Sequence, residues 1–171
     1  MGIGRGDDLG IRNFRNGQLI VQDGSPVPNQ LEILGAEGDL SFTETDATFP
    51  ILSRGVIIAR SQGDQTQMSV TFTAKFEQWS YETGESTGIS PVDAFKQRGG
   101  ASSWISTAPC GPYSVDIIYK AVDVCGTGGK EVLLFPRAHA DSIQFTEGDE
   151  YNTLNFTATC LAAAPTRSWE N

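Results

Sequence analysis

The sequence predicts a mainly β protein, an antiparallel β-sandwich or barrel with one flanking α-helix. Short segments in which apolar and polar residues alternate recur along the chain, as expected for strands with one buried face. The 19 glycines fit a fold with many turns. Only one segment carries the start and stop signals of a helix. With 171 residues, the chain is long enough for one domain with a substantial core.

The chain is predicted to begin with an arm, residues 1–16, which is rich in glycine and charge and shows no periodicity. A single domain is expected to follow over residues 17–161. Its first strands are predicted, in order, at residues 18–22, 31–34 and 39–45.

A long connection, residues 46–67, follows the third predicted strand. Loops longer than about 15 residues are uncommon in small domains and are usually functional or disordered. This connection is too apolar for a disordered segment, so we expect it to contact a partner or a neighbouring copy. The residues expected at this contact are Phe49, Ile51, Leu52, Arg54, Val56, Ile57, Ile58 and Arg60.

The strongest strand signal is at residues 68–79, where apolar and polar residues alternate. Part of it, residues 70–76 (VTFTAKF), recurs as residues 154–160 (LNFTATC). Each copy also follows a similar segment, residues 40–44 (LSFTE) before the first and 143–147 (IQFTE) before the second. The chain is therefore predicted to contain two versions of one β-hairpin, the first with a long connection and the second with a tight turn.

A helix is predicted at residues 91–98. Ser90 is a favourable N-cap, Pro91 suits the first helical position, and Asp93 is an acidic residue in the first turn. The remaining segments are expected to be strands at residues 113–124 and 132–135 and a C-terminal tail at residues 162–171.

The net charge of −9 argues against a protein that holds nucleic acid through its phosphates. It does not exclude a protein that DNA must pass without binding. No stretch approaches the roughly 20 apolar residues of a membrane-spanning helix. We expect no signal peptide, and therefore three free thiols in a reducing compartment.

The sequence indicates no catalytic, metal or cofactor site. His139 is the only histidine, so a catalytic triad would have to use it, and we expect it in a surface turn. A zinc site could formally combine it with Cys110, Cys125 and Cys160, but the close Cys-x-x-Cys spacing of such sites is missing. Residues 126–130 resemble a phosphate-binding loop only faintly and are expected to be a turn.

The order and spacing of several motifs resemble those of tail tube proteins, the major tail proteins of long-tailed bacteriophages. The resemblance covers residues 17–160, and no single motif in it is specific. The motifs are the turn at residues 24–25, residues 31–33 and 35–44, the pair at 54–55, residues 68–79, the helix start at 90–91, and residues 113–116 and 145–148.

This resemblance implies a structural virion protein with a β-sandwich flanked by a helix. In such proteins hexameric rings stack into a hollow tube that conducts the genome during ejection, and each subunit gives four strands to an inner β-barrel. The implied partners are further copies of the chain and the tape measure, terminator and distal tail proteins, while DNA passes through and no membrane is involved. The implied location is the virion tail, after synthesis in the host bacterial cytoplasm.

We expect the polar faces of the two hairpins to line the channel, because short neutral side chains would let DNA slide. Lys75 is an exception, and Glu77, two residues later, is expected on the same face to offset its charge. The expected channel residues are Asp39, Ser41, Thr43, Ser69, Thr71, Thr73, Lys75, Glu77, Ser142, Gln144, Thr146, Thr153, Asn155, Thr157 and Thr159.

Three alternatives remain open at this point. The alternation also fits an ordinary sandwich that exposes one polar face to solvent. A β-sandwich binding or adhesion module of a virion or cell surface would expose aromatic residues on one face and stay monomeric. An enzyme would need a cleft of convergent polar groups, which the sequence does not indicate.

Overall fold

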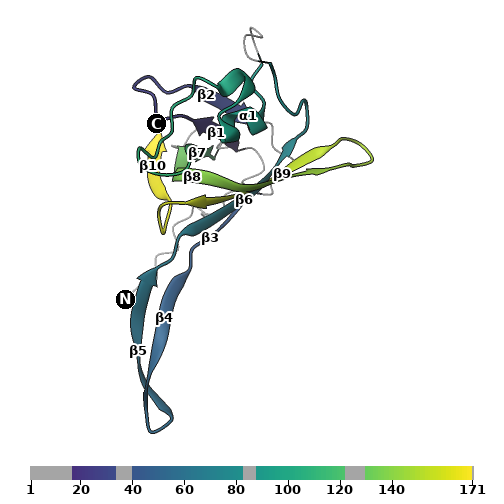
Figure 1. Cartoon of the computed structure of the whole chain (residues 1–171). Helices are drawn as coiled ribbons and strands as arrows, with labels where there is room; N and C mark the ends of the chain where they lie inside the picture. Colours follow the sequence, from purple (N-terminus) through teal and green to yellow (C-terminus); the bar gives the residue numbers. More distant parts are fainter. Residues whose placement is uncertain (1–16, 34–39, 83–87, 122–129, 171) are drawn as a thin grey trace, which may run out of the picture.

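The structure, a computed structural model, describes residues 17–33, 40–82, 88–121 and 130–170 (Figure 1). The arm at residues 1–16, Asp39, Cys125 and most of the turn expected at residues 126–130 lie outside these ranges. The described strands are β1 (Gln18–Gln22), β2 (Gln30–Ile33), β3 (Ser41–Thr43), β4 (Asp46–Ser53), β5 (Val56–Gln65), β6 (Met68–Lys75), β7 (Val115–Lys120), β8 (Lys130–Thr146), β9 (Thr153–Cys160) and β10 (Thr166–Glu170). The helices are α1 (Pro91–Lys96) and a short 3₁₀ turn, η2 (Gly99–Ala101).

Eight of these strands form one sheet, and all of its pairings are antiparallel. Its order is β2-β1-β7-β8-β9-β6-β3, with β10 also paired to β8. β4 and β5 form a separate two-stranded sheet. The predicted fold class is confirmed, because the described ranges are mainly antiparallel β structure and contain one short α-helix.

β8 is a single strand of 17 residues that is shared by the two halves of the sheet. Its first part pairs with β7, and its second part pairs with β9. The sequence predicted two short strands here, because Pro136 was expected to end the first. In the structure Pro136 and Arg137 lie at a β-bulge, where a proline removes no ladder hydrogen bond. Arg137 adopts a positive φ of 52°, and its N–H donates to Oδ1 of Asp116 at 2.8 Å. His139 therefore lies within this strand and not in the expected turn.

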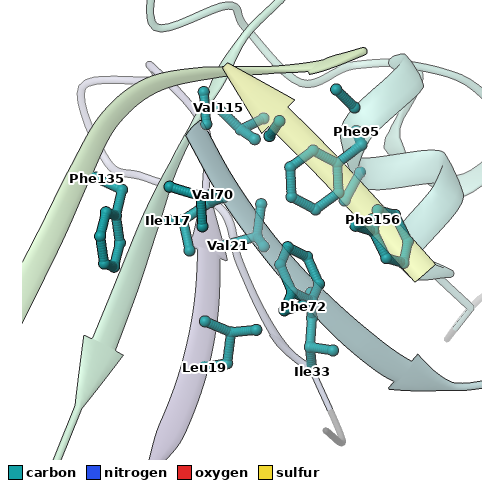
Figure 2. Close-up of a cluster of buried hydrophobic side chains, with 14 of the residues drawn as sticks. Leu19, Val21, Ile33, Val70, Phe72, Phe95, Val115, Ile117, Phe135 and Phe156 are labelled. Atoms are coloured by element: carbon teal, nitrogen blue, oxygen red, sulfur yellow. The ribbon is translucent and has the colours of Figure 1, made fainter. Parts of the chain in front are cut away.

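The core lies between the two halves of the sheet (Figure 2). Val21 of β1 and Ile117 of β7 come from one half, and Val70 and Phe72 of β6 come from the other. All four are almost completely buried, so the apolar parity of each strand faces this common interior. The sandwich is formed by one sheet that packs against itself.

Helix α1 covers one end of this core. Ser90 is its N-cap as predicted, and its side chain and that of Asp93 form a reciprocal capping box. The helix ends two residues earlier than expected, because Gln97 adopts a left-handed conformation with a φ of 50°. The Phe95 ring packs 5.1 Å from that of Phe156, which fixes the helix on β9. Within the described ranges, no helix is long and apolar enough to cross a membrane.

The C-terminal segment is partly ordered as a strand. Residues 162–171 were expected to be a tail, but β10 pairs with β8 along residues 130–134. Arg167 supports this pairing, because its Nε and Nη2 donate to Oε1 of Glu131 at 2.9 and 2.6 Å. β9 and β10 therefore follow one another along the same strand, β8.

Candidate functional site

Four adjacent strands, β3, β6, β9 and β8, bring the two predicted hairpins into one surface. β3 pairs with β6, and β8 pairs with β9, as the internal sequence echo predicted. β6 also pairs with β9, so Thr71 lies opposite Thr157, and the two hairpins are joined side by side. The result is a continuous four-stranded region of the larger sheet.

One face of this region is polar. Residues opposite each other on paired strands point to the same face, so the register defines rows that run across the sheet. These rows are Thr43, Ser69, Thr159 and His139; Ser41, Thr71, Thr157 and Ser142; Thr73, Asn155 and Gln144; and Lys75, Thr153 and Thr146. Every one of these side chains is exposed or half-buried. We name these residues the polar face.

The side chains of the polar face bond to one another. Oγ of Ser41 and Oγ1 of Thr71 are 2.5 Å apart. Thr73 Oγ1 donates to Oδ1 of Asn155 at 2.9 Å, and Asn155 Nδ2 donates to Oγ1 of Thr146 at 2.8 Å. Hydroxyl and amide groups thus satisfy part of their hydrogen-bonding capacity within the sheet, and the centre of the face carries no formal charge.

The charge at the edge of the polar face is arranged differently from the prediction. β6 ends at Lys75, so Glu77 lies beyond the strand and is not part of its face. The Lys75 ammonium lies 4.9 Å from the centroid of the Tyr151 ring, in a cation–π contact. Tyr151, and not the expected Glu77, is therefore the group that the structure places against this cation.

The alternation of the sequence also missed two groups of this face. Asp141 is the extra residue of a second bulge in β8, and Oγ1 of Thr159 donates to its Oδ2 at 2.5 Å. His139 lies opposite Thr159, and its Nδ1 is 2.7 Å from the carbonyl oxygen of Tyr113. A bulge changes which parity faces which side, and sequence periodicity gives no signal of it.

The polar region has two open edges. β3 is the last strand in the order of the sheet, and it pairs only with β6 among the described strands. The pairing of β7 with β8 stops at Ala138, so the stretch of β8 from residue 139 to 146 has one described partner, β9. Open edges present unpaired N–H and C=O groups that can pair with another chain.

Residues 46–67, expected to be a loop, form a β-hairpin that projects away from the main sheet (Figure 1). Ser53 pairs with Val56, and the two residues between them, Arg54 and Gly55, have φ values of 49° and 81°. Positive φ at both central positions is the property of type I′ turns, which match the twist of a two-residue hairpin. β4 and β5 are therefore an antiparallel pair closed by a tight turn, with two irregularities in their register.

The projecting hairpin is apolar on both faces. Phe49 and Ile51 lie on one face of β4, and Leu52 lies on the other face opposite Ile57. Six large apolar side chains of this hairpin are each at least 43% exposed: Phe49, Ile51, Leu52, Val56, Ile57 and Ile58. An isolated two-stranded hairpin is marginally stable in water, and this one lacks a buried face in the described part of the chain. Contact with another molecule would supply one.

No protein-family model matches the chain, and the search of curated proteins finds no match. Among solved structures, the chain is similar to a chain in the "Cryo-EM structure of the anti-feeding prophage (AFP) baseplate, 6-fold symmetrised". The two chains share 10% sequence identity, with a TM-score of 0.47. The match covers 88% of this chain and 92% of the other. A similarity this low carries no argument about function.

The cysteines within the described ranges lie apart from the polar face and from the projecting hairpin. Cys160 is fully buried in β9, where it lies opposite Met68 and Ala138, and Cys110 is exposed. Burial, with smaller contributions from Asp116 and Asp141, raises the pKa of the Cys160 thiol to about 12. Within the described ranges, no three His, Cys, Asp or Glu side chains are grouped to hold a metal ion.

Proposed function

We propose that the protein is a structural subunit of a bacteriophage-type tail, and that hexameric rings of it stack into a hollow tube through which the genome passes. The observation that carries this proposal is the four-stranded polar face, made mostly of hydroxyl and amide side chains, with an open strand at each side. The sequence resemblance to tail tube proteins points in the same direction.

Ring closure would satisfy the two open edges. The outer edge of β3 in one copy would pair with the free stretch of β8 in the next copy. This contact is heterologous, because it joins two different surfaces, and it forms a ring when the rotation between neighbours closes. The four strands of each copy would then form one continuous barrel, with the polar face directed inward.

The chemistry of the polar face suits a channel for DNA. Each phosphate that a Lys or Arg neutralises adds affinity through counterion release, so a cationic wall would retain the genome. The hydroxyl and amide groups of the polar face are neutral, and Tyr151 covers the Lys75 ammonium at its end. The net charge of −9 adds general repulsion of nucleic acid.

Cysteine cross-linking tests the ring. Thr43→Cys on β3 and Gln144→Cys on β8 would be combined in a protein whose Cys110 and Cys125 are replaced by serine. The expected result under oxidation is a ladder of linked species that ends at the hexamer. The control pairs Thr43→Cys with Gln30→Cys on β2, which should give no ladder. A protein that remains monomeric at high concentration and never cross-links would contradict the proposal and favour the binding or adhesion module.

A further inference from the structure

The two ends of the four-stranded region carry different projections. The β4–β5 hairpin leaves the sheet at the end where Thr43 lies opposite Ser69. The turn between β8 and β9 leaves at the end where Lys75 lies opposite Thr153. Figure 1 shows the two projections leaving the main sheet in different directions, the β4–β5 hairpin downward and the β8–β9 turn to the right, so their tips lie far apart in one copy.

The outer part of the β4–β5 hairpin and the β8–β9 turn have opposite charges. Residues 47–63, the outer part of the β4–β5 hairpin, contain Arg54 and Arg60 and no acidic residue, which gives this part a charge of +2. Asp46 and Asp64 lie at the base of the hairpin and bring the charge of the whole hairpin to zero. The rest of the chain then carries −9 − 2 = −11. The β8–β9 turn holds Glu147, Asp149 and Glu150 and no basic residue, and all three are exposed.

The two projections also share exposed apolar surface. Phe145 and Tyr151 flank the acidic turn and are 44% and 42% exposed. The ring of Phe76 lies 5.1 Å from that of Phe145 in an edge-to-face contact, so the turn has an aromatic base. The opposing hairpin offers exposed aliphatic side chains on both faces, among them Ile51 and Ile57.

The position of Arg54 supports a role for its charge. It occupies the first central position of the β4–β5 turn at a φ of 49°, where Asn, Asp or Gly is favoured. The tip of the hairpin therefore carries a cation at a position that disfavours the arginine backbone.

We infer that the β4–β5 hairpin of one copy docks on the acidic β8–β9 turn of a second copy, head to tail along the strand direction. Complementary surfaces at opposite ends of one subunit make a heterologous contact that can repeat without closing. The partner is a second copy of this chain, because the basic and acidic surfaces are both present on every copy. The inference rests on the proposed function in one respect, since within a tube this contact would be the one that joins successive rings.

Two charge-reversal variants test this contact. In the first, Arg54→Glu and Arg60→Glu make both projections acidic. In the second, Asp149→Lys and Glu150→Lys give the β8–β9 turn a net positive charge, like that of the outer part of the hairpin. Each variant alone should associate at least about tenfold more weakly than the unmodified chain, because close charge pairs at interfaces couple by more than about 1.4 kcal/mol. All four positions are exposed or at a turn, so both variants should keep their melting temperatures.

Mixing the two variants gives the decisive measurement. Every hairpin in the mixture can find a turn of opposite charge on the other variant, so separately prepared samples should recover long assemblies once combined. Assembly length would be measured by negative-stain microscopy and sedimentation over a salt series. Glu32→Lys, at an exposed position of β2 away from both projections, is the matched control for a single Asp149→Lys change and should leave length unchanged.

The outcomes separate this inference from the proposed function. If the variants still form rings and the mixture stacks them, both stand. If either variant alone stacks as well as the unmodified chain, or if the mixture fails to recover, the docking contact is wrong while the rings stand. Single-file filaments without rings would support the contact and overturn the tube. Arg54→Asn, which relieves the turn and removes one charge, should retain its fold and still weaken association.

Discussion

At the scale of single residues, Asp23 shows how one buried carboxylate fixes two distant segments. Its oxygens accept hydrogen bonds from Oγ of Ser25 at 2.6 Å, from the N–H of Asn29 at 2.8 Å and from the N–H of Ile105 at 3.1 Å. Burial acts to raise the pKa of Asp23, but these hydrogen bonds outweigh it and lower the pKa to about 2. The ionised carboxylate therefore holds the turn after β1 against the segment that precedes β7.

Asp23→Asn should make the protein less stable at neutral pH, by about 2 kcal/mol. The folded-state pKa lies below the unfolded value of 3.8, so the stabilisation is fully present above about pH 4 and is lost as the pH falls toward 2. Urea unfolding between pH 2 and pH 7 would measure this. The unmodified protein should lose stability through that window, and the variant should show a flatter profile. Identical profiles would contradict the assigned role.

The buried Cys160 thiol should be unreactive in the folded protein. Because its pKa is raised to about 12, it remains protonated at pH 8, and the thiolate is the reactive form. In a protein whose Cys125 is replaced by serine, titration with a thiol reagent at pH 8 should label the exposed Cys110 at once and Cys160 only after denaturation. A Cys110→Ser variant gives the control, and rapid labelling of Cys160 in native protein would show that the site is open.

At the scale of elements, the sequence predicted those strands that have one apolar face and one polar face. The similarity between residues 70–76 and 154–160 identified both hairpin pairings. Alternation of apolar and polar residues directly indicates a strand with one buried and one solvent-facing side. β4 and β5 gave no such signal, since apolar residues occupy both of their faces. β10 was missed because it is held by the edge of β8, a contact that local sequence does not encode.

The β4–β5 hairpin should be dispensable for folding and necessary for assembly. Its strands pair with each other, and in the described part of the chain the core cluster includes none of its residues. Replacing residues 47–63 with a short Gly-Ser linker should change the melting temperature by no more than a few degrees. The same variant should form no tubes in negative-stain micrographs. A large loss of stability, or tubes of normal length, would contradict this division of roles.

At the scale of the whole molecule, the residues of the polar face could be predicted and their final arrangement could not. Parity alone assigned Ser41, Thr71 and Thr157 to polar faces of separate hairpins. Their alignment in one row depends on the pairing of β6 with β9, which joins segments more than 80 residues apart. The bulges that bring Asp141 and His139 to this face are likewise a product of tertiary packing.

This row makes the proposed channel testable. Lysine at Ser41, Thr71 and Thr157 would place three adjacent cations on each subunit of the polar face. Added cations bind phosphate by releasing counterions, so assembled tubes of this variant should retain DNA and slow its passage. The effect should be strongest at low salt and should fade as ionic strength shortens the screening distance to about 8 Å.

The control for this prediction adds the same charge elsewhere. Lysine at Gln30, Ser102 and Ser103, which are exposed and lie outside the polar face, should leave DNA passage unchanged. Both variants would first be checked for intact tubes by microscopy, and DNA retention would then be measured over a salt series. Because the two variants have equal net charge, any difference between them reports where the lysines lie and not how many there are. Equal retention by both variants would place the polar face on a surface other than the channel wall.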